Sequence, residues 1–134
     1  MRIKRIEHVA IAVKNLDAAR DAFARLGIAC DYEETIPENG IRLAMLPIGE
    51  SALELLEPKT ETSRTAQWIR ERGEGLYHIC LEVEDIEGAL AELRAKGVRL
   101  RDEVPCIGHG GHRIAFLEPE STAGILVELV EMTH

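Results

Sequence analysis

Cysteine is scarce in this sequence, and long apolar runs are absent. The three cysteines, Cys30, Cys80 and Cys106, form no C-x-x-C pair and lie in or near apolar segments. We interpret them as reduced thiols, which excludes zinc fingers and disulfide scaffolds. No segment approaches the roughly 18 apolar residues that a membrane span needs. Residues 1–8 lead into an alternating strand pattern without an apolar signal segment. We therefore expect a cytoplasmic protein without a membrane partner.

Basic charge is also in short supply. The chain has 16 Lys and Arg residues against 24 Asp and Glu residues, which gives a formal net charge of −8. Nucleic-acid binding needs a basic face that neutralises phosphates, and the sequence shows none, so we expect no nucleic-acid partner. An anionic small-molecule substrate would need a cation, or a few placed Arg and Lys side chains, to overcome the overall negative field.

An internal repeat is the main feature that is present. Residues 8–13 align with residues 78–83 at an offset of 70, and the same register continues through the segment that follows each of them. Residues 53–56 align with residues 127–130 at an offset of 74. Each half reads as a strand, a helix and three further strands. This pattern predicts an α+β fold built of two tandem βαβββ modules.

The repeat sets the expected domain organisation. At 134 residues, with 46% apolar residues, the chain is long enough for one domain with a real core. We predict a single domain over residues 1–134. Module one covers about residues 1–60, a connecting helix about 62–73, and module two about 75–134.

Each half contains one amphipathic helix pattern with its own start and stop signals. Asn15 and Asp85 are the expected N-caps, and Gly27 and Gly97 the expected stops. The apolar helix faces are formed by Leu16, Ala19, Phe23 and Leu26 and, in the second half, by Ile86, Ala89, Leu90 and Leu93. We expect strands at about residues 3–13, 29–36, 41–47, 51–57, 76–83, 99–104, 112–118 and 124–131.

Four polar residues stand at repeated positions on these strands. His8 and His78 open the first strand of each half, and Glu54 and Glu128 interrupt an aliphatic run in the last strand of each half. Because strand side chains alternate between faces, both histidines lie opposite the apolar face of their strand. If the two half-sheets curve toward each other, all four side chains point into one cleft. Any one of them alone also fits a half-exposed strand, but their joint placement favours a metal site.

The donor set narrows the choice of metal. Two imidazoles and two carboxylates suit Zn²⁺, Mn²⁺, Fe²⁺, Co²⁺ or Ni²⁺ better than Ca²⁺ or Mg²⁺. Three further histidines, His109, His112 and His134, have no histidine at the equivalent repeat position, so we expect surface or loop roles for them. Residues 108–111 are predicted to form a flexible Gly-rich connection, which is weak evidence for a phosphate site.

These features resemble the vicinal oxygen chelate superfamily and, within it, the methylmalonyl-CoA epimerase family. The resemblance covers nearly the whole chain and is carried by residues 8–13, 54–58, 72–79 and 124–129. It implies a cupped eight-stranded sheet around a metal site, with His8, Glu54, His78 and Glu128 as the ligands. It also implies a divalent metal ion as cofactor, with Co²⁺ favoured and Mn²⁺, Zn²⁺ or Ni²⁺ as alternatives, and a homodimer.

The implied activity is the interconversion of (2R)- and (2S)-methylmalonyl-CoA through an enolate, with an acyl-CoA as the small-molecule partner. The α-proton must leave to a base within hydrogen-bond reach and return on the opposite face. Leu43 stands where some epimerases have a Glu proposed as that base, so the resemblance points to Glu128 as the catalytic residue. Glu118 and Glu120 replace a His and a Lys of the family, which would weaken the binding of polyanionic coenzyme A.

Three other functions fit the same fold. A lactoylglutathione lyase of the glyoxalase I type would use the same ligands on a glutathione hemithioacetal, and fold analogy alone does not choose between substrates. An extradiol dioxygenase would use Fe²⁺ with two His and one carboxylate, and the fourth ligand counts against it. A non-catalytic small-molecule-binding protein is the third, and the four filled ligand positions argue against that function too.

Overall fold

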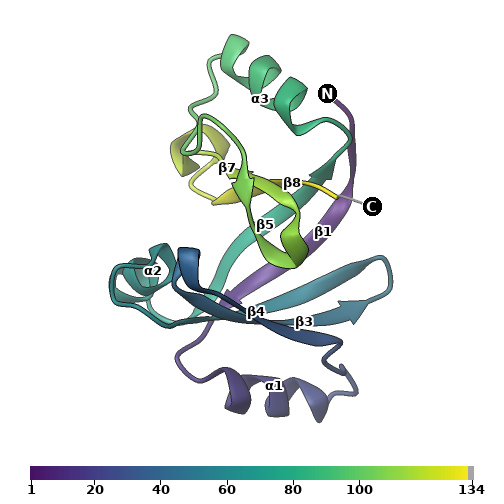
Figure 1. The fold of residues 1–134 in the computed structure, drawn as a ribbon, viewed down its shortest axis with the longest axis vertical. Coiled ribbons are helices and arrows are strands. Elements are labelled where there is room, and N and C mark those ends of the chain that lie inside the picture. The colour runs from purple at the N-terminus through teal and green to yellow at the C-terminus, as the bar shows by residue number, and fades with distance from the viewer. Residues whose placement is uncertain (133–134) are drawn as a thin grey trace. The chain divides into compact units, whose positions relative to one another are not determined.

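The computed structural model describes residues 1–132 and contains the repeated elements in the expected order. The elements are β1 (Ile3–Ala12), α1 (Leu16–Ala24), β2 (Tyr32–Ile36), β3 (Ile41–Ile48), β4 (Ser51–Pro58), α2 (Arg64–Arg72), β5 (Gly75–Val83), α3 (Ile86–Ala95), β6 (Cys106–Ile107), β7 (Arg113–Phe116) and β8 (Val127–Glu131). Short 3₁₀ segments lie at Pro37–Asn39, His109–Gly111 and Pro119–Thr122. The strands form an eight-stranded sheet in the order β2-β3-β4-β1-β5-β8-β7-β6. Figure 1 labels β1, β3, β4, β5, β7 and β8.

The chain forms two compact units whose boundary falls inside β1 and β5. The first unit comprises residues 1–8 together with the chain from residue 78 on, and the second unit comprises residues 9–77. The start of β1 therefore belongs with the second module, although it is the first strand of the chain. The single-domain organisation of the whole chain stays a prediction.

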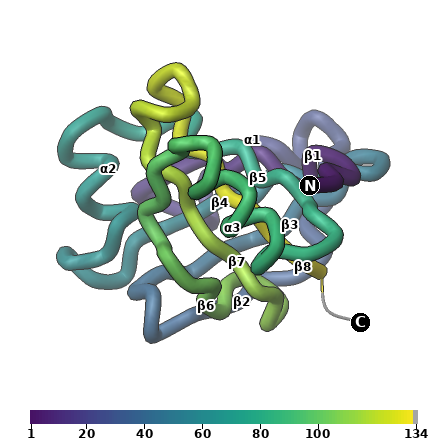
Figure 2. The backbone as a smooth tube through the Cα atoms, turned by 90° about the horizontal axis from the view of Figure 1, so that it is seen from above, coloured from purple at the N-terminus to yellow at the C-terminus, as the bar shows by residue number. Residues whose placement is uncertain are grey.

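The two modules have the same strand topology, which confirms the tandem βαβββ fold of the α+β class. In the second unit β4 runs parallel to β1 and antiparallel to β3. In the first unit β8 runs parallel to β5 and antiparallel to β7, as can be followed in Figures 1 and 2. The registers correspond as well, since Glu54 lies opposite Ala10 and Glu128 lies opposite Cys80.

The predicted helices begin where the sequence signals place them. The Asn15 side chain accepts a hydrogen bond from the backbone N–H of Ala18, at 3.0 Å, and Asp85 accepts one from Gly88 at 3.1 Å. Both side chains satisfy an N–H group that has no partner within the helix itself. Gly97 follows the C-cap of α3 with a φ of 85°, a conformation that glycine adopts without steric cost.

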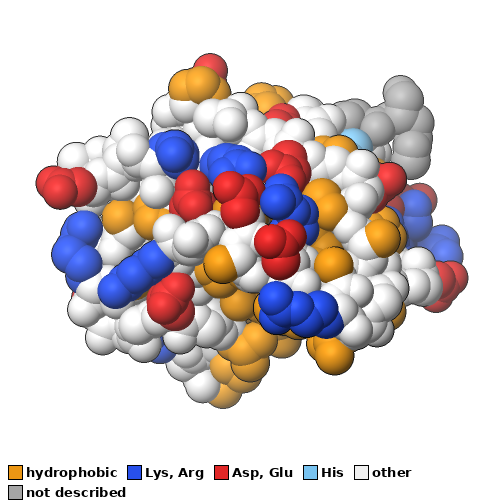
Figure 3. Space-filling model, turned by 90° about the horizontal axis from the view of Figure 1, so that it is seen from below, with side chains coloured by type: hydrophobic (Ala, Val, Ile, Leu, Met, Phe, Trp, Pro, Cys, Tyr) orange, Lys and Arg blue, Asp and Glu red, His pale blue; other side chains and the backbone are white. Residues whose placement is uncertain are grey.

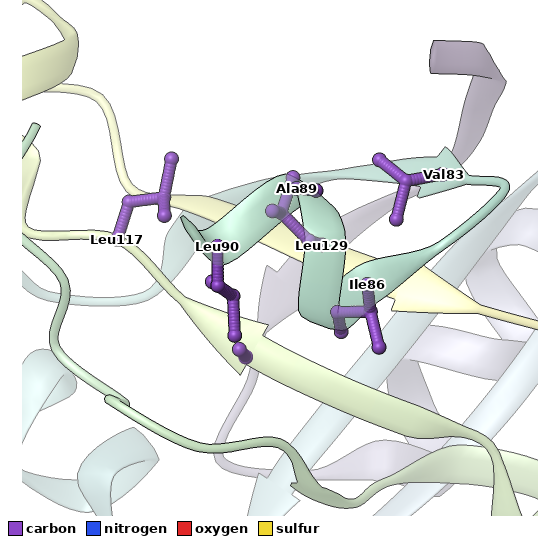
Figure 4. Packing of buried hydrophobic residues seen from close by; sticks show 7 residues of the cluster. Val83, Ile86, Ala89, Leu90, Leu117 and Leu129 are labelled. Carbon is purple, nitrogen blue, oxygen red and sulfur yellow. The ribbon is translucent and has the colours of Figure 1, made fainter. Parts of the chain in front are cut away.

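Each unit has its own apolar core between a helix and its sheet. In the first unit α3 packs on the sheet through a cluster formed by Val83, Ile86, Ala89, Leu90, Ala115, Leu117 and Leu129 (Figure 4). In the second unit the cluster is formed by Val13, Leu16, Ala44, Leu46 and Leu55. The assignment of Leu26 to the apolar face was wrong, because α1 ends at Ala24 and the Leu26 side chain is 72% exposed.

The strand expected at 99–104 is also wrong. Only Leu100 forms a bridge there, with Leu117, and the sixth strand is Cys106–Ile107. The side chain of Asp102 accepts a hydrogen bond from the backbone N–H of Phe116 at 2.9 Å. Because an Asp side chain competes with the backbone for such donors, it interrupts the regular ladder at this point.

The surface carries charges of both signs, and Figure 3 shows acidic and basic side chains mixed over one face. In the second unit Glu33 forms ion pairs with Arg20 and with Arg42, and Arg42 also contacts Asp17. Among the described residues, no helix is long and apolar enough to cross a membrane.

Candidate metal centre

Three of the four predicted ligands meet in the first unit. His8 on β1, His78 on β5 and Glu128 on β8 are all buried. The two imidazole Nε2 atoms lie 3.1 Å apart, and Oε1 of Glu128 lies 3.1 Å from Nε2 of His8 and 3.0 Å from Nε2 of His78. Three potential donor atoms thus form a nearly equilateral triangle inside the protein.

The spacing of these atoms fits a divalent cation. Ligand atoms about 2.1 Å from an ion, at right angles to one another, lie roughly 3.0 Å apart. Oε1 of Glu128 is buried, and within residues 1–132 it has no hydrogen-bond partner of good geometry despite its closeness to both imidazoles. This oxygen and the two imidazole nitrogens are close together but are not oriented for hydrogen bonds. Ligand atoms around a shared ion have the same arrangement. Two nitrogens and one carboxylate oxygen also suit a first-row transition metal or zinc.

The electrostatics of the site call for positive charge. Burial by itself would raise the pKa of Glu128, but the adjacent His78 and His8 imidazoles outweigh burial and hold that pKa well below its usual range. The carboxylate is therefore stabilised in its ionised form. A bound cation at the same place would supply the same compensation.

Cys80 also lies beside the triangle. Its sulfur is within 4.8 Å of the donor atoms of His8 and Glu128. Burial raises the pKa of the Cys80 thiol well above its ordinary value. A metal ligand must be the thiolate, so ligation by Cys80 would require the metal to displace the thiol proton.

The fourth predicted ligand, Glu54, belongs to the second unit. It is 4% exposed and lies in the middle of β4, flanked across the sheet by Ala10 and Met45. A buried carboxylate in an aliphatic strand carries a large desolvation cost unless a charged partner compensates it. Leu43, on β3 of the same unit, is 1% exposed, and its side chain has no group that can take up a proton.

Two functional candidates were missed by the sequence interpretation. Glu7 and His109 are 6% and 4% exposed, and Oε1 of Glu7 lies 2.6 Å from Nδ1 of His8 and 2.9 Å from Nε2 of His109. His109 does lie in the Gly-rich connection, but the expected surface role is wrong because its ring is buried. His112 is half-buried next to it, and His134 lies outside the described residues.

The missed residues had weak signals. Strand alternation places Glu7 on the face opposite His8, so it was not expected to reach the His8 ring. An acidic residue beside a candidate ligand histidine was the one available sign, since ligating histidines usually donate their second N–H to a carboxylate.

With this geometry established, the family follows from comparison. Residues 7–116 match the model of the Glyoxalase/Bleomycin resistance protein/Dioxygenase superfamily. The chain belongs to this superfamily. The matched segment spans most of both modules of this superfamily member and includes three of the four predicted ligands, with Glu128 beyond its end.

Known members of the superfamily are similar to this chain over nearly its whole length. The ethylmalonyl-CoA/methylmalonyl-CoA epimerase of Cereibacter sphaeroides is 36% identical over 133 residues, which cover 97% of this chain and 99% of the relative. A variant of Streptomyces coelicolor methylmalonyl-CoA epimerase, in complex with 2-nitronate-propionyl-CoA, is 39% identical with a TM-score of 0.94, covering 98% and 96% of the two chains. A methylmalonyl-CoA epimerase in complex with methylmalonyl-CoA and NH4+ is 38% identical, also with a TM-score of 0.94 and the same coverage.

Proposed function

We propose that the chain is a metal-dependent epimerase that interconverts (2R)- and (2S)-methylmalonyl-CoA. The observation that carries this proposal is the similarity, at 36–39% identity over nearly the full length, to epimerases of which one has been solved with methylmalonyl-CoA. The triangle of His8, His78 and Glu128 supports it, because the reaction needs a site for a cation.

In this proposal four side chains hold the cation. His8 and His78 contribute Nε2 and Glu128 contributes Oε1, the three atoms that meet in the first unit. We assign Glu54 as the fourth ligand because it is buried and occupies the repeat position equivalent to Glu128. Co²⁺ is the proposed ion, with Mn²⁺, Zn²⁺ and Ni²⁺ as alternatives. A divalent cation supplies Lewis-acid stabilisation of the negative charge that develops on the thioester oxygen when the α-proton leaves.

Glu128 is the proposed base of the reaction. Its Oε1 faces the two imidazoles, so Oε2 is the oxygen that takes the α-proton. A carboxylate whose pKa is held low is a weak base. A bound cation would also lower the pKa of the substrate α-carbon, which would reduce the difference between the pKa of the acid and that of the base. Leu43 cannot transfer a proton on the opposite face of the enolate. We assign proton transfer on that face to an ordered water or another solvent-linked group.

The deciding experiment is a coupled assay with purified protein after reconstitution with Co²⁺. We expect racemisation of methylmalonyl-CoA, and a parallel arm with ethylmalonyl-CoA tests the width of the acyl pocket. A third arm measures lactoylglutathione formation from the glutathione hemithioacetal of methylglyoxal. Robust lactoylglutathione formation without racemisation would make the chain a lyase of the glyoxalase I type. Stoichiometric metal with neither activity would favour a non-catalytic small-molecule-binding protein.

Location and assembly complete the proposal. We propose a homodimer, on the basis of the resemblance to the epimerase family, and retain the cytoplasmic location expected from the sequence as part of the proposal. Cell fractionation tests the location. Multi-angle light scattering tests the assembly, since a mass of about one chain, 14.9 kDa, would contradict a dimer.

A further inference from the structure

Some buried polar groups take no part in the proposed mechanism. Glu7 and His109 are such groups, and both lie in the first unit together with His8. One oxygen, Oε1 of Glu7, contacts both imidazoles, at 2.6 Å from Nδ1 of His8 and 2.9 Å from Nε2 of His109. The rings of His8 and His109 lie edge to face with centroids 5.0 Å apart.

We propose that Glu7 and His109 are positioning residues, which hold the His8 ring so that its Nε2 lone pair is presented to the metal. This inference rests on the proposed metal site. The short contact assigns the proton of His8, because an ionised carboxylate only accepts hydrogen bonds. Nδ1 therefore carries a proton, and Nε2 is the nitrogen that faces His78 and Glu128.

The carboxylate of Glu7 is itself held in place. It is 6% exposed, and its Oε1 lies between the two imidazoles of His8 and His109. His109 is the outer member of the arrangement. It touches the carboxylate that holds His8, so its influence on the metal site must pass through Glu7.

The Gly-rich segment is built to bury His109. Its backbone folds tightly on itself, with the N–H of Gly108 donating to the carbonyl of His112 at 2.9 Å. A Cβ atom at Gly108 would lie 2.6 Å from Cδ1 of Ile114, closer than side chains tolerate. The absence of a side chain at this position lets the loop approach β7 and bring the His109 ring next to Glu7.

A second metal ion is the competing explanation for the same three residues. Glu7, His8 and His109 do place donor atoms within 4.8 Å of one another. The 2.6 Å separation between Nδ1 and Oε1 is slightly shorter than the about 2.7–2.9 Å of charge-assisted N–H···O hydrogen bonds, so the two atoms are in direct hydrogen-bond contact. The proton on Nδ1 occupies the position that a metal would need, so the hydrogen-bonded arrangement is favoured.

The first test detects the Nδ1-bound proton of His8 by NMR in metal-free protein and measures how fast it exchanges with solvent. With ¹⁵N-labelled histidine, we expect the wild type to show an Nδ1-bound proton on His8 that is protected from exchange. The proton should lose that protection in Glu7→Leu and exchange faster in His109→Gln. An equally protected Nδ1 proton in Glu7→Leu would overturn the proposal. This readout needs no metal, so it is independent of the proposed function.

The second test measures Co²⁺ affinity by chelator competition. Loss of a group that supports a ligand typically weakens binding about 10- to 100-fold, and we expect this of Glu7→Leu. Glu7→Gln keeps an acceptor oxygen and should lose less than about 10-fold. His109→Gln should weaken binding about threefold, whereas the matched change His112→Gln, in the same loop, should stay within about twofold of wild type.

A double-mutant cycle distinguishes an effect of His109 on Co²⁺ affinity through Glu7 from a general distortion of the loop that contains His109. Because His109 acts through Glu7, the His109→Gln effect should vanish in the Glu7→Leu background. An unchanged effect in that background would overturn the arrangement, as would a stoichiometry of two Co²⁺ ions per wild-type chain. A wild type that binds no Co²⁺ would instead overturn the proposed metal site, while the proton measurement still decides the role of Glu7.

Discussion

His8 and His78 occupy the same position in the two modules, yet their rings are held in different ways. Nδ1 of His8 is hydrogen-bonded to Oε1 of Glu7, and Nε2 of His109 lies 2.9 Å from the same oxygen. The His78 ring instead lies edge to face against the Phe116 ring, with centroids 5.1 Å apart. The residue before His8 is Glu7, but the residue before His78 is Tyr77, whose ring packs with Trp68. The two modules thus share the histidine but differ in the residues that contact its ring.

The comparison separates two ways to preorganise a ligand. A carboxylate fixes both the direction of the ring and the nitrogen that carries the proton. An aromatic neighbour restricts the direction of the ring by packing and does not by itself select the nitrogen that carries the proton. The contact with Glu7 therefore specifies the position of the proton on His8.

Removal of either histidine should have the largest effect, because both contribute directly to the proposed site. We expect His78→Ala to lose most of the bound metal and nearly all activity, and His8→Ala to match it. Loss of a ligand must cost more than the roughly 10- to 100-fold that loss of a supporting group costs. Inductively coupled plasma analysis measures the metal content. A His78→Ala protein with the same metal content as wild type would rule out the site.

Substitution of the two equivalent glutamates, Glu128 and Glu54, should change the rate of α-carbon exchange by very different amounts. Glu128→Gln can still ligate through its amide oxygen but cannot accept a proton, so we expect deuterium exchange at the α-carbon to fall about 100- to 10,000-fold. Glu54→Gln is the matched change in the other module and should lose less than about 10-fold, because the proposal gives Glu54 a role as a ligand only. Both variants are assayed in heavy water with bound Co²⁺. If the metal-loaded Glu128→Gln protein exchanged the α-proton at the wild-type rate, Glu128 would be a metal ligand and not the base.

Phe116→Leu tests the packing support of His78. Phe116 is 9% exposed, so its replacement leaves a partly filled space and removes an edge-to-face contact. We expect the free energy of unfolding to fall by about 1–2 kcal/mol, as measured by urea denaturation of the metal-free protein. Co²⁺ affinity should change less than about threefold, well below the effect expected for Glu7→Leu. A larger loss of affinity than in Glu7→Leu would reverse the ranking of the two supports.

The smallest effect is expected at the exposed ion pairs of the second unit. The hydrogen bond from Arg42, followed by that from Arg20, lowers the pKa of Glu33 below its ordinary value of 4.5, and Arg42 also lowers the pKa of Asp17 from 3.8. A carboxyl whose pKa is lowered by folding stabilises the protein above its ordinary pKa, and this contribution disappears as the pH falls through the lowered value.

Arg42→Gln should therefore reduce the midpoint of thermal unfolding by at most about 3 °C at neutral pH. The difference from wild type should shrink in acid, as Glu33 and Asp17 become protonated, and also in high salt. Thermal melts at neutral pH and near pH 3 provide the measurement. A difference that grows toward low pH would mean that Arg42 acts through some other contact.

Much of the fold could be read from the sequence because its signals are local. The side chains of Asn15 and Asp85 accept hydrogen bonds from backbone N–H groups of their own helices, and Gly97 adopts a positive φ just after one helix. These signals act within a few residues, so they do not depend on what the helix packs against. The strand at 99–104 failed because the side chain of Asp102 competes for a backbone donor of a distant strand, and a local pattern does not contain that contact.

The repeat by itself singled out His8, Glu54, His78 and Glu128 as candidate ligands, since duplication marks equivalent positions without any knowledge of distance. Only the tertiary structure decided which atoms meet and what stands behind them. Glu7 lies on the wrong face by strand alternation, and His109 lies about a hundred residues away in a loop that reads as a flexible turn. The His109 ring reaches Glu7 because the loop packs closely on β7, and contacts between segments so far apart in the chain depend on packing that no local sequence pattern records.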